Sequence, residues 1–228
     1  MPRATFSRDL QRLEDSILVL GSMAGQAVVD SVSSLKAQDL ESAQRIVNDD
    51  RLINERRFGI EADVLALIAT QQPMASDLRV LASILEIATE LERIGDYGKG
   101  IAKIALLIGL EPLIKPLIDL PRMASRVQEM LQQSLEAFTG RNVELALQVA
   151  ASDDEVDALY NQVYRELLTF IISDPRTIDQ ATHLLWVGHN LERAGDRVTN
   201  ICERVVFMVT GKMTELETND DVGGESLS

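Results

Sequence analysis

The chain has very little cysteine and few aromatic, glycine and proline residues, and each shortage excludes a class of protein. With one cysteine, Cys202, among 228 residues, the sequence allows neither an intramolecular disulfide nor a cysteine-based zinc site. Aromatic residues make up 4%, and the 13 glycines and 6 prolines are too sparse for a protein of many short strands. The scarcity of cysteine is typical of a reducing compartment, so we expect a cytoplasmic protein.

Basic residues are also in short supply. The chain has 22 lysines and arginines against 36 aspartates and glutamates, which gives a net charge of −14. Nucleic acid binding needs clustered basic residues, and an anionic membrane surface repels an acidic protein, so neither is an expected partner. The uncharged stretch 16–29 is shorter than the roughly 18–20 residues of a membrane span. We therefore expect no direct membrane insertion, and partners that are cations or proteins with basic surfaces.

What the chain does have is apolar periodicity. Hydrophobic residues make up 46% of the sequence and recur at three- and four-residue spacing, which predicts long amphipathic helices. Gly140 is a predicted helix C-cap, and the last helix is expected to begin at Pro175 and stop at Gly211. The predicted helices are 6–35, 39–69 and 74–107 in the first half and 121–139, 143–172 and 175–209 in the second.

The predicted fold class is all-α, with two tandem, sequence-related three-helix bundles made of six long helices. Residues 1–110 form the first bundle, 111–120 a proline-containing linker and 121–211 the second bundle. The acidic tail 212–228 is expected to be disordered. Because short connections make successive helices antiparallel neighbours, we expect the two bundles to be joined end to end.

A repeated hexapeptide supports the division into two halves. The sequence LERIGD at 91–96 recurs as LERAGD at 191–196, a shift of 100 residues that indicates a duplicated unit. In each copy a glutamate and an aspartate stand four residues apart, so a helix places both carboxylates on one face. Like charges at this spacing destabilise a helix unless something outside it compensates them.

These acids continue the apolar lines of their helices, so the periodicity places them on or beside the inward face. One further aspartate interrupts the apolar line of the preceding helix in each half. Burying unpaired carboxylates costs several kcal/mol or shifts their pKa, and a bound cation removes that penalty. Carboxylate oxygens suit hard or borderline metals, so the candidate ions are iron, manganese, magnesium or zinc. The candidate ligands are Glu92, Asp96 and Asp50 in the first half and Glu192, Asp196 and Asp153 in the second.

Exposed salt bridges are an alternative interpretation of the same acids. Basic residues lie beside both motifs, at Arg93, Lys99, Lys103 and Arg193. Glycine inside a helix costs about 1 kcal/mol relative to alanine. Gly95 and Gly195 therefore indicate that a neighbouring group approaches each motif closely.

Signatures of catalysis are missing from the chain. Neither His183 nor His189 has a glutamate three residues before it, so the Glu-x-x-His pattern of di-iron bundles is absent. Cys202 is interpreted as apolar filler on a helix. The sequence has no glycine-rich phosphate loop and no nucleophile elbow, and we predict no catalytic residues.

The motifs resemble those of the PhoU family of phosphate-signalling regulators. The matching stretches are QQPMASDLRVLASILEIATELERIGD in the first half and NLERAGDRVTNICERVV in the second. The resemblance implies two three-helix bundles with an acidic metal site in each, and it adds Asn200 to the candidate ligands. The chain departs from the family pattern at Tyr97 and Arg197, where histidine is common, and at Gly100, where asparagine is expected.

The resemblance also implies a function. The family's role is that of a cytoplasmic, non-enzymatic regulator which links a phosphate ABC transporter, through its ATPase subunit, to a sensor histidine kinase. Such a protein acts as a negative regulator when phosphate is plentiful, and homodimer formation is a family-level expectation. The alternatives are a carboxylate-ligated metalloenzyme or metal-storage bundle, and a metal-free structural bundle.

Overall fold

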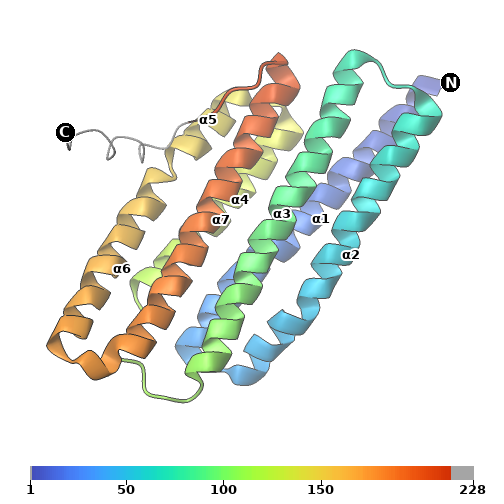
Figure 1. Ribbon diagram of the computed structural model, residues 1–228. Coiled ribbons are helices and arrows are strands. Elements are labelled where there is room, and N and C mark those ends of the chain that lie inside the picture. The colour runs from blue at the N-terminus through green and yellow to red at the C-terminus, as the bar shows by residue number, and fades with distance from the viewer. Residues whose placement is uncertain (1, 217–228) are drawn as a thin grey trace, which may run out of the picture.

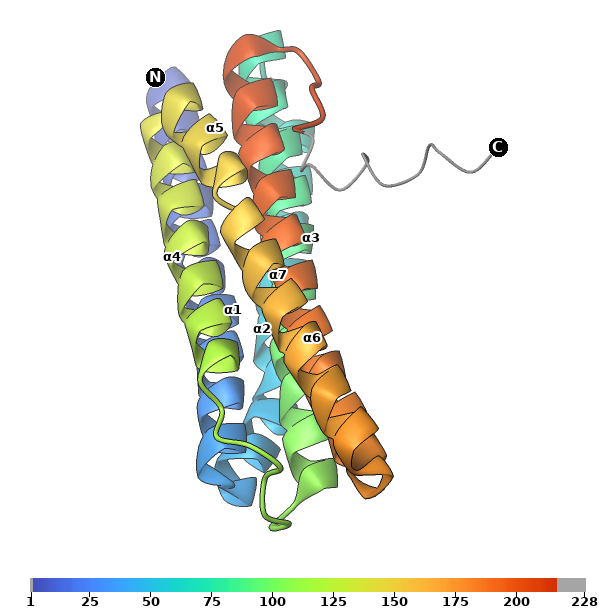
Figure 2. The same ribbon diagram turned by 90° about the vertical axis from the view of Figure 1, so that its left-hand side faces the viewer.

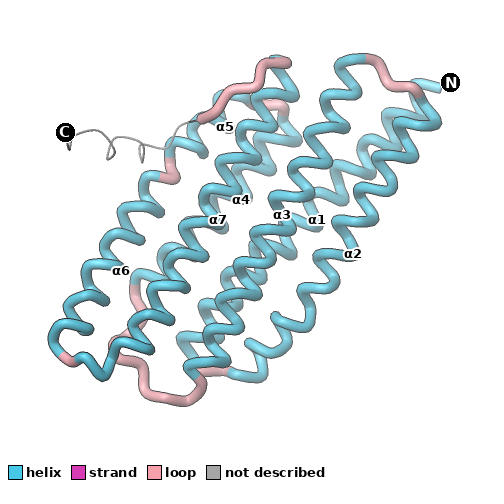
Figure 3. The backbone as a smooth tube through the Cα atoms, viewed as in Figure 1, coloured by secondary structure: helices cyan, strands magenta, loops and turns pink. Residues whose placement is uncertain are grey.

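The structure is a computed structural model that describes residues 2–216, and over this range it consists of helices and short connections only (Figures 1 and 3). The all-α prediction is confirmed, and the six predicted helices are present with the fifth divided in two. The last twelve residues of the predicted tail, 217–228, lie outside the described residues. The helices are α1 (Pro2–Ala37), α2 (Leu40–Gln71), α3 (Ala75–Ile108), α4 (Asp119–Gly140), α5 (Val143–Ala151), α6 (Asp154–Ser173) and α7 (Ile178–Thr210), with a 3₁₀ turn, η1, at Pro175–Thr177.

The prediction of one continuous helix over 143–172 is wrong, because the chain breaks at Ser152 and Asp153. The Ser152 hydroxyl donates to the Val149 carbonyl over 2.7 Å, a side-chain bond that competes with helix propagation. The run of acids that follows suits the positive end of a new helix, so α6 begins there. The equivalent helix of the first half, α2, continues without a break past Asp50.

Two other helix ends differ from the sequence-based expectation. Helix α4 includes Gly140, and its C-cap is Arg141 in the left-handed region at φ 52°. Helix α7 starts at Ile178 because Asp174 caps the 3₁₀ turn that precedes it. The C-cap of α7 is Gly211 at φ 74°, where the sequence placed the end of the helix.

The two halves lie side by side, so the expectation of bundles joined end to end is wrong. Helices α3 and α7 run antiparallel at the centre, α1 and α4 pair behind them, and α2 and α6 flank the centre on opposite sides (Figures 1 and 2). The linker folds back against the second half instead of extending the molecule. Its Leu117 is buried, and the Gln180 side chain of α7 accepts from Ile114 N and donates to the Pro112 carbonyl.

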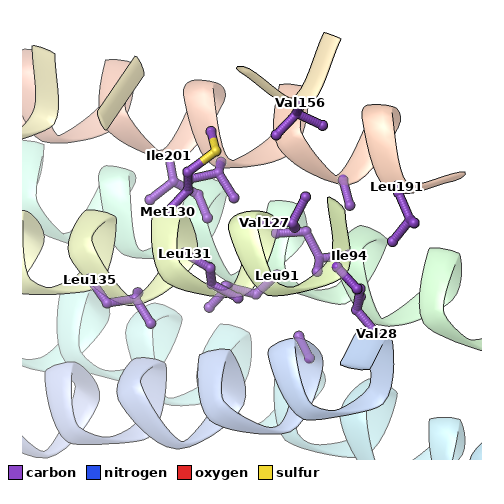
Figure 4. Packing of buried hydrophobic residues seen from close by; sticks show 14 of the residues in the cluster. Val28, Leu91, Ile94, Val127, Met130, Leu131, Leu135, Val156, Leu191 and Ile201 are labelled. Carbon is purple, nitrogen blue, oxygen red and sulfur yellow. The ribbon is translucent and has the colours of Figure 1, made fainter. Parts of the chain in front are cut away.

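One hydrophobic core passes through both halves. Buried hydrophobic side chains of α1 and α3 belong to the same cluster as those of α4, α6 and α7 (Figure 4). Among residues 2–216, α1 is the one helix long and apolar enough by composition to cross a membrane. Its apolar line instead packs into this shared core, through residues such as Ile17, Leu20 and Val28.

Gly98 allows α1 and α3 to approach each other closely. A Cβ atom at residue 98 would lie 2.9–3.0 Å from the backbone of Ala27 and Val28, which cannot move aside as a side chain can. We expect Gly98→Ala to lower the free energy of unfolding by about 1–3 kcal/mol. The matched control is Gly59→Ala on α2, where the new Cβ meets no atom within 4 Å and higher helix propensity should stabilise the protein. Urea denaturation measures both, and equal effects would contradict the prediction.

Candidate metal-binding clusters

The first acidic cluster joins α2 to α3 through a lysine. Lys99 donates to Asp50 Oδ2 over 2.6 Å and to Asp96 Oδ1 over 3.3 Å. Asn54 Nδ2 also donates to Asp50 Oδ2, over 3.1 Å. The hydrogen bond to Asp50 raises the pKa of Lys99, because it favours the ammonium form. The Lys99 ammonium therefore bridges carboxylates from two neighbouring helices.

The two motif acids of the first half lie at the edge of this cluster. The Asp96 side chain is 48% exposed, so of the two predicted placements, on or beside the inward face, it does not occupy the first. Burial raises the pKa of Glu92, and the nearby charge of Asp96 raises it further. The deeply buried carboxylate is instead Asp50, which interrupts the apolar line of α2. The exposed-salt-bridge interpretation thus fits the pair of Lys99 with Asp96, but not its pair with the buried Asp50.

The second acidic cluster has a more deeply buried centre. Asp153 is 1% exposed and lies at the start of α6, against α7. Its Oδ2 accepts from the Thr199 hydroxyl over 3.3 Å, whereas its Oδ1 has no hydrogen-bond partner among the described residues. Burial, followed by the charges of Asp157 and Asp196, raises the pKa of Asp153 to about 7.

The motif acids of the second half have partners on their own helix. His189 Nδ1 lies 3.2 Å from Glu192 Oε2, and Arg193 Nε lies 3.6 Å from Asp196 Oδ2. In the described part of the chain, no three His, Cys, Asp or Glu side chains are already arranged around one point as in a preformed metal site. The carboxylate-rich donor set and the orphaned oxygen of Asp153 fit a hard cation. The side chains of Glu192 and Asp196 are 19% and 34% exposed, and they would have to move closer to Asp153 to share an ion with it.

Both motif glycines have a close neighbour, as the sequence predicted. A Cβ at residue 95 would lie 2.8 Å from Ile53 Cδ1. A Cβ at residue 195 would lie 2.4 Å from Asp153 Oδ1, closer than atoms approach without displacement. Gly195 therefore keeps open the space that the orphaned oxygen of Asp153 occupies.

The two motifs meet where α3 and α7 cross, and the contacts there follow a two-fold pattern. Asn200 Nδ2 donates to Glu90 Oε2 over 3.1 Å, and the repeat-related position Gly100 lies against Asn190, whose Oδ1 is 3.1 Å from an ideal Cβ. Glu90 and Asn190 occupy equivalent positions in the two repeats, and so do Gly100 and Asn200. Exchanging the two repeats therefore exchanges the two contacts, as in an isologous interface. The hydrogen bond of Asn200, a predicted ligand, thus runs to α3 rather than to the second cluster.

Several residues that build these clusters were not predicted from the sequence. Glu90 is buried between the halves, and Asp157, Thr199 and His189 adjoin the second cluster. The i,i+3 spacing of His189 and Glu192 was a usable signal. The interpretation of Cys202 as filler is confirmed, because the thiol is buried and burial raises its pKa to about 12.

Comparison with known proteins identifies the family of this chain. The family model described as the PhoU domain matches residues 17–105 and again 120–205, once in each half. The chain belongs to the PhoU family. Curated relatives named phosphate-specific transport system accessory protein PhoU homolog occur in Clostridium acetobutylicum and Rhizobium meliloti. The first is 37% identical over 95% of this chain and 99% of its own length, and the second is 36% identical over 96% and 92%.

Solved structures of PhoU proteins have the same fold. The crystal structure of PhoU from Pseudomonas aeruginosa aligns with a TM-score of 0.85 at 34% identity, covering 91% of this chain and all of that one. The structure of the phosphate transport system regulatory protein PhoU from Streptococcus pneumoniae also gives 0.85, at 32% identity, with coverage of 92% and 99%. The resemblance inferred from the two motifs is therefore confirmed at the level of the family.

Glu90 is a buried charge that connects the two halves of this PhoU-family chain. It is 6% exposed and accepts from Arg93 over 2.7 Å and from Arg197 over 3.4 Å. We expect Glu90→Gln to lower the free energy of unfolding by roughly 1–3 kcal/mol, because Arg197, whose side chain is 16% exposed, would be left without its counter-charge. Thermal denaturation measures the loss. The control is Glu86→Gln, one turn earlier and exposed, and a loss of equal size there would refute the role of Glu90.

Proposed function

We propose that this protein is a cytoplasmic, non-enzymatic accessory regulator of phosphate uptake and phosphate-starvation signalling. It contacts the ATPase subunit of a phosphate ABC transporter and a sensor histidine kinase, and it keeps the starvation response off when phosphate is plentiful. The observation that carries the proposal is the match to phosphate-specific transport accessory proteins along nearly the whole chain. A second copy of the chain is a further proposed partner.

The physical properties of the molecule agree with a docking role. A net charge of −14 favours partners with basic surfaces. The helices share one core, so the outer helices α2 and α6 are presented on a packed support. A support of this kind holds a binding surface in a fixed shape, which reduces the conformational entropy lost on association.

Deletion of the gene tests the regulatory role. In phosphate-rich medium, a starvation-response reporter should be switched on in the deletion strain and return to its basal level when the wild-type gene is restored. Deleting the sensor kinase in the same strain should switch the reporter off again, because the signal would pass through that kinase. An unchanged reporter in the single deletion would refute the regulatory role. A response that persists without the kinase would refute the proposed link.

A metal ion is proposed as a structural component of the protein. The residues that would hold it are the carboxylates of the two acidic clusters. In the second cluster these are Asp153, with its buried Oδ1, and the motif acids Glu192 and Asp196. The ion would supply positive charge between α6 and α7 and so remove the repulsion among these acids. Elemental analysis after purification in metal-free buffers would identify it among iron, manganese, magnesium and zinc.

A metalloenzyme or metal-storage bundle is the second candidate function. The observation in its favour is the buried, orphaned oxygen of Asp153 among other carboxylates, a donor set that also occurs in carboxylate-bridged metal centres. Oxidase and hydrolase assays on metal-loaded protein would detect such chemistry. Turnover that Glu192→Ala abolishes would favour an enzyme, whereas many ions bound per chain would favour storage.

A further inference from the structure

The two acidic clusters correspond position by position, and they differ in charge. Lys99 and Thr199 each stand three residues after the motif aspartate of their half, and each bonds to the buried aspartate of the neighbouring helix. Asn54 in the first half corresponds to Asp157 in the second, each four residues after that buried aspartate. The second cluster therefore has one ammonium group fewer and one carboxylate more than the first.

We propose that Lys99 serves as the built-in cation of the first cluster, and that the protein binds a single divalent metal ion, at the second cluster around Asp153. The inference rests on the metal-binding part of the proposed function and goes beyond it, because it assigns opposite roles to the two repeats. It is independent of the regulatory role in phosphate signalling.

The first cluster is closed to a metal ion by its own geometry. The Lys99 ammonium lies 2.6 Å from Asp50 and 3.3 Å from Asp96, the place where an ion bridging α2 and α3 would bind. A divalent ion would have to displace this ammonium, since two cations so close together repel each other strongly at the low dielectric of a partly buried site. Asn54 adds a further hydrogen bond to the same oxygen of Asp50, so the carboxylate already has two donors there.

The second cluster differs in the group that bonds to its buried aspartate, whereas the Oδ1 atoms of Asp50 and Asp153 are both buried without a hydrogen-bond partner among the described residues. Thr199 supplies a neutral hydroxyl where Lys99 supplies a charge, and its bond to Asp153 is long at 3.3 Å. Asp153 Oδ1 is buried without a hydrogen-bond partner and points at Gly195, between Glu192 and Asp196 in the motif. A buried carboxylate oxygen without a donor is costly, and a divalent ion would stabilise it together with the flanking acids.

Exchanging the two residues tests the inference. Mn²⁺ is the probe, because carboxylates bind it and its electron paramagnetic resonance signal counts free and bound ions. The wild type should bind one equivalent, Lys99→Thr two equivalents and Thr199→Lys none. The double variant with both substitutions should again bind one equivalent, now at the first cluster. Adding Asp50→Asn to this double variant should abolish that binding. Circular dichroism would establish that each variant is folded.

Lys103→Thr is the matched control, because it removes a lysine from the exposed face of the same helix and should leave one equivalent bound. A wild type that binds two ions would refute the assignment of Lys99 while leaving metal binding intact. A wild type that binds none would refute metal binding at both clusters, and the deletion phenotype would still decide the regulatory role. Unchanged stoichiometry in Lys99→Thr and Thr199→Lys would likewise overturn the inference.

Discussion

Asp153→Asn is expected to stabilise the metal-free protein at pH 8, although most substitutions at buried positions are destabilising. Burial and three neighbouring carboxylates oppose the charge of Asp153, whose pKa is raised from 3.8 to about 7. At pH 8 the wild type must keep this group ionised in the folded state. An amide of the same shape avoids that cost, and the gain should be on the order of 2–4 kcal/mol in the free energy of unfolding.

The gain should depend on pH with a definite sign. The folded protein holds the Asp153 proton more tightly than the unfolded chain does, because the folded-state pKa lies above the unfolded value near 3.8. The wild type therefore loses stability relative to Asp153→Asn as the pH rises from about 4 to about 7, and the difference is constant above that range. Urea denaturation of both proteins in a chelating buffer, at several pH values, measures it.

The repeat-related substitution Asp50→Asn is the matched control and should have the opposite sign. Asp50 has a bonded ammonium group in Lys99, so removing its charge leaves that lysine with the exposed Asp96 alone. We expect a loss of roughly 1–3 kcal/mol. Destabilisation of similar size by both substitutions would show that the two clusters are electrostatically alike, contrary to the structure.

Leu91→Ala should destabilise the second half as much as the first, although Leu91 belongs to the first repeat. The side chain is fully buried in the core that both halves share, beside Leu131 of the second half (Figure 4). Deleting it should cost about 2–5 kcal/mol. The single tryptophan, Trp186, lies on α7 in the second repeat. If the protein unfolds as one unit, its fluorescence will report the loss of stability caused by a substitution in the first repeat.

The measurement is urea denaturation followed by Trp186 fluorescence and by circular dichroism. Both signals should change together, and Leu91→Ala should move both midpoints by the same amount. The control Leu107→Ala removes a 70% exposed leucine from the same helix and should have little effect. A tryptophan midpoint that Leu91→Ala leaves unchanged would mean that the repeats are separate folding domains.

The helices were predictable from the sequence because their signals are local. Apolar spacing located six helices, Asp39 caps α2, and Gly211 ends α7. The break at Ser152 was missed because apolar periodicity passes through it without a gap. The acids of 153–157 were interpreted as part of a continuous helix, although they also form a helix start signal.

The arrangement of the halves and of the site depends on contacts that local patterns do not encode. The repeat predicted two related units, but the same pattern allows end-to-end and side-by-side packing. The acids of the motif were placed on or beside the inward face from their spacing, and this spacing did not show that Asp96 would be 48% exposed while Asp50 would be buried. Glu90 was overlooked since its partners on α7, Arg197 and Asn200, are more than 100 residues away.

The two-fold crossing of α3 and α7 has a consequence for how the repeats can differ. Two identical subunits joined in this way would carry the same residue at both equivalent positions, because one gene would encode both. A lysine introduced at one cluster would then appear at the other as well. Covalent fusion of the repeats removes that constraint, so Lys99 and Thr199 can coexist within one nearly symmetrical molecule. In a single chain, one repeat can thus neutralise its acids with a lysine while the other keeps a neutral residue and binds a metal ion. In a homodimer, both subunits would have to do the same.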